Sequence, residues 1–288
     1  MIRMSIEEIK HSVNLLKSEQ PSIKYRERLI SELLEEFPFW IQSVKHKIEG
    51  GQETRKFFRC RNDFFDDLKY MCEPPKEVVR SSGRANYIGE SVLYCTDTDF
   101  YSCILELVDR NNLKPQQMTV IEFESVKDFY VVPVGIVDRE TYTKLLEVDF
   151  NESEFEKYTI ISKFMDEEFR MHTEADDRNY QNSSVIAKLV MDWFPQTVGI
   201  RYKTVQNFNF FHRGLNYAFM PERVEGLFKF NKAIQYEYHW KEDKMYQFQP
   251  SLLRTGTIHN NGMIEYVDET RIDHEDYYDI DQPNLEKT

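Results

Sequence analysis

The stretch Arg80-Ser-Ser-Gly-Arg-Ala-Asn-Tyr-Ile-Gly89 is followed at once by Ser91-Val-Leu-Tyr94. It predicts a polar loop, punctuated by glycines and carrying two arginines, that runs into a short apolar strand ending in Tyr94. Glu106 comes next, in a segment that is otherwise apolar and has the character of a helix. An anionic ligand with a ring to stack and a developing positive charge to stabilise would need these three features. The stretch therefore favours a site for a nucleotide whose glycosidic bond is broken.

Length and charge narrow the classes of protein that the chain can belong to. Its 288 residues allow one large domain or two modest ones, and 21 Phe, 17 Tyr and 3 Trp indicate a globular protein. A formal net charge of −13 argues against direct binding of nucleic acid and against an anionic membrane surface. No apolar run approaches the roughly 18 residues of a membrane span, and the N-terminus lacks the apolar core of a signal peptide. We therefore expect a cytoplasmic protein.

Cysteine and histidine spacing gives no sign of a metal centre. Cys60, Cys72, Cys95 and Cys103 form no CxxC pair, and the seven histidines form no HExxH motif. We expect four free thiols, mostly buried and inert, with no metal and no required cofactor.

Residues 1–52 are predicted to form a helical N-terminal extension. Ser5 and Glu8 make a capping box before a first helix, and apolar residues recur at helical spacing through a second helix over Ile23–Phe37. A third helix is expected from Pro38 to about Ile48.

Residues 53–264 are predicted to form an α+β domain on a mixed or antiparallel sheet, because regular βαβ alternation is missing. A helix over Val185–Trp193 is expected to be capped by Asn182 or Ser183. The expected strands are Met118–Phe123, Tyr130–Val137, Thr197–Tyr202, Leu215–Met220, Leu227–Phe230 and Ala233–Trp240. Residues 265–288 hold nine acidic side chains and a net charge of −7, which is typical of a solvated or disordered tail.

A small basic island interrupts this acidic chain. Residues 55–84 carry eight Lys/Arg and five Asp/Glu, which indicates a compact anionic ligand more than a polymer. The planar fork of arginine suits phosphate, because it donates two parallel hydrogen bonds. The alternative is that these arginines pair with Asp63, Asp66 or Asp67 at the surface.

A series of motifs follows in order over about residues 55–230. They are Phe58-Arg-Cys-Arg61, Glu73-Pro-Pro75, Gly83-Arg-Ala-Asn86, Gly89, Leu93-Tyr94, Glu106, Tyr180, the helix over Ser183–Trp193, Val198-Gly-Ile-Arg-Tyr-Lys-Thr204 and Gly214-Leu-Asn-Tyr-Ala-Phe219. In this order and spacing, the motifs resemble the RES-domain family, which includes bacterial toxins that degrade NAD.

The resemblance implies a fold related to ADP-ribosyltransferases and a cleft that holds NAD as substrate. Arg59 matches the family arginine, with Arg61 a near alternative, and Arg84 matches the second arginine. Tyr94 matches the tyrosine that would stack on nicotinamide, and Glu106 matches the catalytic glutamate.

Other positions match less closely. The family serine falls at Thr204, which keeps the hydroxyl but adds a methyl group. Asn86 is a further expected contact to NAD, and Ser183 and Ser184 are weaker candidates for the role of the serine.

Glu106 would stabilise the oxocarbenium-like state as nicotinamide leaves. If water attacks the ribose carbon, the enzyme is a glycohydrolase. If inorganic phosphate attacks as a co-substrate, the enzyme is a phosphorylase. The resemblance further implies a toxin with a helix-turn-helix antitoxin as its partner. The sequence does not decide whether the protein forms a homo-oligomer. Two alternatives remain: a mono-ADP-ribosyltransferase acting on a protein, and a non-catalytic module that binds NAD.

Overall fold

A ten-stranded sheet runs through the computed structural model, which describes residues 4–18, 21–47, 54–97, 100–105, 107, 116–136, 140, 143–144, 151–171, 180–203, 215–240 and 248–273. Neighbouring strands are antiparallel except for β5 and β6, which are parallel. The expected α+β class with a mixed sheet is therefore confirmed. The strands lie in the order β1 (Gln42–Val44), β5 (Phe129–Pro133), β6 (Gly199–Lys203), β7 (Leu215–Phe219), β3 (Leu93–Thr96), β2 (Lys56–Asn62), β4 (Gln116–Ser125), β8 (Phe228–Trp240), β9 (Phe248–Ile258) and β10 (Ile264–Asp273).

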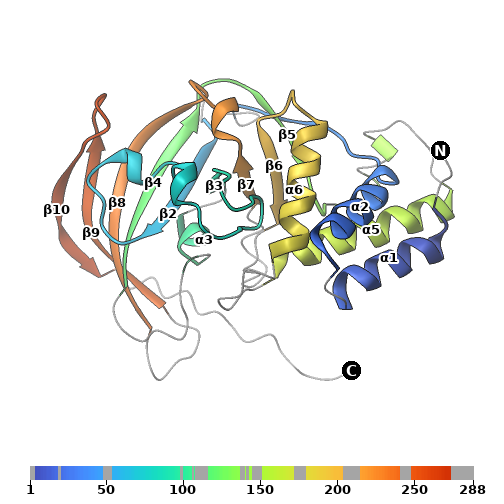
Figure 1. The fold of residues 1–288 in the computed structure, drawn as a ribbon. Helices are drawn as coiled ribbons and strands as arrows, with labels where there is room; N and C mark the ends of the chain where they lie inside the picture. Colours follow the sequence, from blue (N-terminus) through green and yellow to red (C-terminus); the bar gives the residue numbers. More distant parts are fainter. Residues whose placement is uncertain are drawn as a thin grey trace, which may run out of the picture.

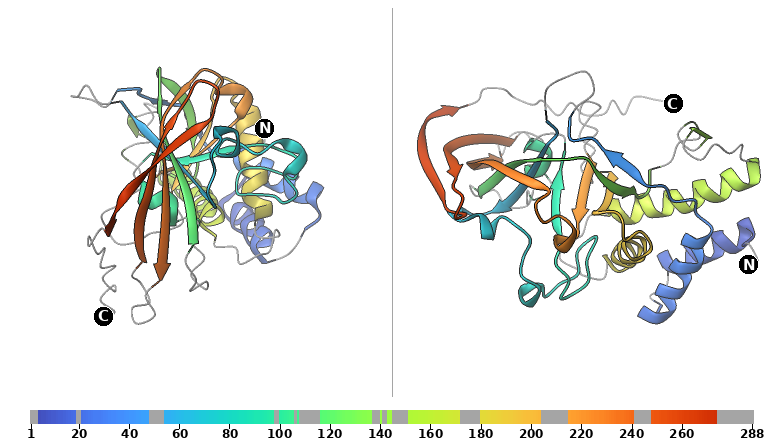
Figure 2. Two further views of the ribbon diagram at one scale, coloured as in Figure 1. Left: turned by 90° about the vertical axis from the view of Figure 1, so that its left-hand side faces the viewer. Right: turned by 90° about the horizontal axis from the view of Figure 1, so that it is seen from above.

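Four long helices gather beside the β5–β6 end of the sheet, whereas the β8–β10 end carries no long helix among the described residues (Figure 1). These four are α1 (Ile6–Ser18), α2 (Ile23–Glu35), α5 (Glu152–Arg170) and α6 (Gln181–Trp193). The short helix α3 (Phe100–Leu105) packs against β2, β3 and β4. Single 3-10 turns are η1 (Leu68–Tyr70), η2 (Lys76–Val78) and η4 (Pro221–Arg223). Figure 2 shows the same separation of helices and strands from the side and from above.

Helix starts follow local capping chemistry. The Ser5–Glu8 capping box is confirmed, because the Glu8 amide donates to Ser5 Oγ at 3.2 Å and the Ser5 amide donates to Glu8 Oε2 at 2.7 Å. The helix α5 was not expected, although Asn151 caps it by accepting a hydrogen bond from the Glu154 amide at 2.8 Å. The helix α6 begins at Gln181, so the expected cap at Asn182 or Ser183 is wrong.

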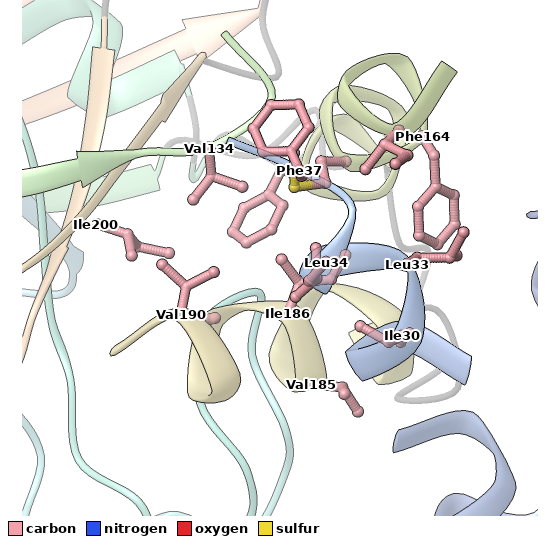
Figure 3. Close-up of a cluster of buried hydrophobic side chains, with 14 of the residues drawn as sticks. Ile30, Leu33, Leu34, Phe37, Val134, Phe164, Val185, Ile186, Val190 and Ile200 are labelled. Atoms are coloured by element: carbon pink, nitrogen blue, oxygen red, sulfur yellow. The ribbon is translucent and has the colours of Figure 1, made fainter. Parts of the chain in front are cut away.

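The helices and the sheet share an apolar core. Figure 3 shows that α2, α5 and α6 point their apolar side chains toward one another and toward Val134 and Ile200 at the sheet. Fully burying one such side chain stabilises the fold by about 1.5–3 kcal/mol, so this cluster fixes the helices on the sheet. The labelled members from the helices are Ile30, Leu33, Leu34, Phe164, Val185, Ile186 and Val190.

The third N-terminal helix, expected over residues 38–48, is wrong. Residues Gln42–Val44 form β1 and pair with Phe129–Val131 of β5. Phe37 and Trp40, which precede β1, are buried in the apolar core shared by the helices and the sheet, and this burial positions the chain for the pairing with β5. The segment 1–52 therefore contributes a strand to the main sheet, and tertiary pairing overrides a local helical pattern.

Two strand expectations near the C-terminus also need correction. The strands expected over Leu227–Phe230 and Ala233–Trp240 are one strand, β8, with a register shift opposite Glu122 and Phe123 that leaves Asn231 outside the pairing with β4. The first part of the acidic tail is the ordered strand β10, which pairs with β9 over Ile264–Asp273. The expectation of disorder is therefore wrong for these residues, whereas the expected solvent exposure holds at Glu265, Val267, Asp268 and Glu269. The rest of the tail lies outside the described residues.

Candidate functional site

The loop from Arg80 to Gly89 folds back on itself through a tight bridge. The Gly83 amide donates to the carbonyl of Asn86 at 3.0 Å. A Cβ at position 83 would lie 2.5 Å from Asn86 Oδ1 and 2.9 Å from the Tyr94 hydroxyl, so only glycine fits there. Gly89 has φ of +79° and closes the loop in a conformation that glycine adopts easily.

Tyr94 holds this loop against β3. Its hydroxyl accepts a hydrogen bond from the Ala85 amide at 2.8 Å and donates one to Asn86 Oδ1 at 2.7 Å. Asn86 is buried, and its amide nitrogen donates to the carbonyls of Tyr87 and Glu90. Burial raises the pKa of Tyr94, so the hydroxyl keeps its proton. The polar atoms of Tyr94 and Asn86 therefore position the loop, and Tyr94 also packs against the apolar core.

The sheet opens between β2 and β3, and Arg59 fills the opening. The two strands are in register at only one pair, Phe58 with Thr96. Arg59 Nη1 donates to the Tyr94 carbonyl at 2.9 Å, and its Nη2 donates to the Cys72 carbonyl at 3.2 Å. The guanidinium of Arg59 therefore gives the Tyr94 carbonyl a hydrogen bond that backbone pairing between β2 and β3 does not supply.

Arg59 is a buried cation that contacts no carboxylate among the described residues. It is 8% exposed, and its Nε has no hydrogen-bond partner in this part of the chain. Burial lowers the pKa of Arg59, and the neighbouring Arg61 cation lowers this pKa further. Burying a charge without an opposite charge is costly. Among the described residues, the positive charge of Arg59 therefore has no opposite charge, and an anion that enters the site would neutralise it.

Two further arginines flank Arg59. Arg61 Nη1 donates to the Tyr70 carbonyl at 2.5 Å, and its guanidinium lies 5.4 Å from the centre of the Phe65 ring. Arg84 Nη2 donates to the Met171 carbonyl at 3.1 Å, and its guanidinium lies 5.3 Å from the centre of the Tyr180 ring.

The surface pairing considered for the basic island does not occur at Arg59 or Arg61 within the residues that the structure describes. Asp67 instead pairs with Lys69, with 2.7 Å between Oδ2 and Nζ. Asp63 accepts a hydrogen bond from the Phe64 amide at 2.8 Å. These acidic side chains are therefore engaged locally and leave the two arginines to the site.

A cleft of about 480 Å³ brings these groups together. A second cleft of about 280 Å³ adjoins it and shares Arg59, Pro74, Gly83 and Tyr94 as a common wall. The first volume is within the range of sites for small molecules and nucleotides. The larger cleft is lined by Arg59, Cys60, Arg61, Asn62, Pro74, Gly83, Arg84, Tyr94, Cys95, Thr96, Cys103, Leu107, Tyr180, Tyr202 and Asn216.

The thiols of the chain surround the same arginine. Cys60, Cys95 and Cys103 are buried and line the larger cleft, and all four cysteines are free. Burial raises the pKa of Cys95 and Cys103 well above the ordinary value, and raises the pKa of Cys72 to about 11. These thiols are therefore protonated at neutral pH and are poor nucleophiles.

The expected site residues divide into three groups. Arg59, Arg61, Arg84 and Tyr94 line the larger cleft, and Asn86 lines the smaller one. Ser183 and Ser184 are fully buried in α6, where their hydroxyls donate to the carbonyls of Tyr180 and Gln181. Their expected place at the ligand is therefore wrong, because the helix turns both hydroxyls onto its own backbone. Glu106 and Thr204 lie outside the described residues, and Cys103 and Leu107, on either side of Glu106 in the sequence, line the cleft.

Sequence reasoning missed four residues of the cleft wall as site residues. Thr96 and Asn216 are buried polar residues on paired strands, opposite each other in β3 and β7. Tyr180 and Tyr202 add aromatic surface. One signal was present in the sequence, since Thr96 lies two residues after Tyr94 and a strand places such residues on the same face.

No family model, curated protein or solved structure matches the chain. Among the described residues, no group of three or more His, Cys, Asp or Glu side chains is placed to hold a metal ion. No helix in the described part is both long and apolar enough to cross a membrane.

Proposed function

We propose that this protein consumes NAD by cleaving the bond between nicotinamide and ribose. One observation carries the proposal: Arg59, Arg84 and Tyr94, which belong to three separate motifs, line one cleft. The cleft contains a buried cation without a carboxylate partner in the described part of the chain, which favours an anionic ligand. Aromatic and polar walls suit a nucleotide better than a simple ion.

The described residues have distinct roles in this proposal. Arg59, Arg61 and Arg84 hold the diphosphate through charge-assisted hydrogen bonds. The ring of Tyr94 stacks on nicotinamide, while its hydroxyl stays bound to Ala85 and Asn86 and keeps the loop in place. Because these partners are part of the fold, the site is ordered before the substrate arrives, which reduces the entropy lost on binding.

The remaining roles follow from the resemblance to the RES-domain family. Glu106 hydrogen-bonds the ribose hydroxyls and stabilises the positive charge that develops on the sugar. The bond from the anomeric carbon to the nicotinamide nitrogen breaks, and its electron pair leaves with nicotinamide. Water or inorganic phosphate then forms the new bond to that carbon, with release of a proton. Thr204 positions a phosphate or the carboxamide.

The proposal extends to fold relationship and biological role. We infer a relationship to ADP-ribosyltransferases, with the cleft between β2 and β3 as the site for NAD. The protein acts in the cytoplasm as the toxin of a toxin–antitoxin pair. Its partner is a helix-turn-helix antitoxin that covers the cleft.

Proton NMR of NAD incubated with the full-length protein tests the activity. We expect free nicotinamide, together with ADP-ribose when water attacks or its anomeric phosphate when phosphate attacks. Glu106→Ala should abolish the release of nicotinamide. Glu225→Ala, which removes an exposed carboxylate away from the cleft, is the matched control and should keep full activity.

Other outcomes separate the alternatives. Transfer of label from radiolabelled NAD to a protein would identify a mono-ADP-ribosyltransferase. Tight binding of NAD with no nicotinamide released over hours would identify a binding module. If the protein neither binds NAD nor releases nicotinamide, with and without phosphate, the proposed function is wrong.

A further inference from the structure

Thr96 carries a buried hydroxyl at the wall of the larger cleft. The residue is 1% exposed, and its Oγ1 makes no hydrogen bond with any part of the chain that the structure describes. Buried hydroxyls normally have a partner, because an unsatisfied one loses its hydrogen bond to water. The position therefore carries a polar group that the described fold does not use.

The strand arrangement places Thr96 on the wall of the cleft, between β2 and β7. It ends β3, where it pairs with Phe58 of β2 on one side and with Asn216 of β7 on the other. Opposite residues of antiparallel strands have Cβ atoms about 4.5–5.5 Å apart, so Thr96 and Asn216 are close neighbours. Thr96 also stands two residues beyond Tyr94, on the same face of β3.

A second unsatisfied polar atom lines the same cleft. Arg59 Nε is buried and has no hydrogen-bond partner among the described residues, although both terminal nitrogens of its guanidinium donate to carbonyls. Arginine can only donate hydrogen bonds, whereas threonine can donate and accept. A ligand that satisfies both atoms therefore needs oxygen acceptors, as a diphosphate has.

We propose that Thr96 is a ligand-binding residue of this cleft, whose hydroxyl donates a hydrogen bond to an oxygen of a diphosphate-bearing ligand beside Arg59. This inference rests on the proposed function, because it assigns the residue to the same substrate. It also explains why a position suited to valine by size and burial carries a threonine. The hydroxyl has no partner among the described residues of the free protein, and the ligand supplies one in the complex.

Calorimetric titration of the full-length protein with ADP-ribose tests this assignment. Thr96→Val keeps the shape of the side chain and removes the hydroxyl, so it should weaken binding by about tenfold or more. Thr96→Ser keeps the hydroxyl and should bind within about threefold of the wild type. The melting temperature of Thr96→Val should equal or exceed that of the wild type, because no internal hydrogen bond is lost.

Unchanged affinity of Thr96→Val for ADP-ribose would overturn the assignment. It would also be overturned if Thr96→Val melted at a lower temperature than the wild type while Thr96→Val and Thr96→Ser lost the same amount of affinity for ADP-ribose. Nicotinamide release by the wild type is measured in parallel. If the wild type releases nicotinamide and Thr96→Val still binds normally, the role of Thr96 is wrong and the proposed function stands. If the wild type neither binds ADP-ribose nor releases nicotinamide, both are wrong.

Discussion

Among the residues that the structure describes, two arginines are buried, and their surroundings differ. Arg26 on α2 is 4% exposed and lies among the four long helices, where its Nη1 donates to Asn182 Oδ1 at 2.5 Å. The carboxylate of Glu168 on α5 offsets part of the lowering of the pKa of Arg26 that burial causes. Arg59 on β2 is 8% exposed and contacts two backbone carbonyls but no carboxylate in the described part of the chain.

The difference indicates which buried charge belongs to the fold and which belongs to a site. At Arg26 the helix layer supplies an opposite charge and an amide, and Asn182 in turn donates to the Leu16 carbonyl at 3.2 Å. Arg26 therefore connects α1, α2 and α6 and is close to α5. The Nε of each arginine lacks a hydrogen-bond partner among the described residues, but at Arg59 the described sheet supplies only dipoles, and the unsatisfied nitrogen belongs to a residue that lines a cleft. An anion that enters the cleft would complete that environment.

The largest effect is expected from removal of the helix-layer arginine. Arg26→Met leaves Asn182 Oδ1 without its buried donor and removes one of the two cations near the buried carboxyl of Glu168, so we expect the free energy of unfolding to fall by about 3 kcal/mol or more. Denaturant unfolding followed by circular dichroism measures this change. Arg28→Met removes an exposed arginine of the same helix, paired with Glu32, and should cost under about 0.5 kcal/mol. Equal unfolding midpoints for the two variants would contradict the comparison.

Glu168 should make stability depend on pH in a defined window. Burial raises the pKa of Glu168 from 4.5 to about 7. A hydrogen bond from Asn182 and the positive charges of Lys17 and Arg26 lower this pKa, but their effect is smaller than that of burial. The unfolded chain loses this proton first as pH rises, so stability falls from about pH 4.5 to pH 7 and then levels. The charge of Glu167 raises the same pKa and acts in the same direction.

Unfolding of the wild type and Glu168→Gln at several pH values measures this contribution. The stability of the wild type relative to the variant should fall by about 3 kcal/mol across the window, since each unit of pKa shift is worth about 1.4 kcal/mol. A difference between the two proteins that stays constant from pH 4.5 to 8 would show that Glu168 titrates normally.

A smaller effect, and one on binding instead of folding, is expected at the cleft. Arg59→Met should weaken the binding of ADP-ribose by about 1.5–3 kcal/mol, because hydrogen bonds to a charged group are lost. Its free energy of unfolding should change less than that of Arg26→Met, since no carboxylate of the described chain is left unpaired. Arg59→Lys keeps the charge but not the planar fork, so it should recover only part of the affinity.

Calorimetry and denaturant unfolding on the same preparations separate the two effects. A variant Arg59→Met that binds ADP-ribose normally but unfolds as easily as Arg26→Met would make Arg59 a structural residue. The distinction between the two arginines would then be lost.

The sequence predicted local structure well where short-range chemistry decides it. The Ser5–Glu8 capping box formed, and the β4 and β7 strands lie close to their expected bounds, because their apolar patterns are clear. The strand β1 was missed because its pairing with β5 joins residues far apart in the chain. The helix α5 was missed because its apolar stripe is diluted by charged residues, and only packing against α1, α6 and β6 shows which face is buried.

For the candidate site, too, some features follow from the local sequence and others depend on tertiary contacts. The sequence by itself determined the residue types, namely the glycine-bracketed loop, the arginines and Tyr94, because a motif is defined by the order and spacing of its residues along the chain. Only the tertiary structure decided that Ser183 faces its own helix and that, among the described residues, Arg59 has no carboxylate partner and Thr96 has no hydrogen-bond partner. Burial and hydrogen-bond partners depend on segments brought together from distant parts of the chain, which local spacing does not encode.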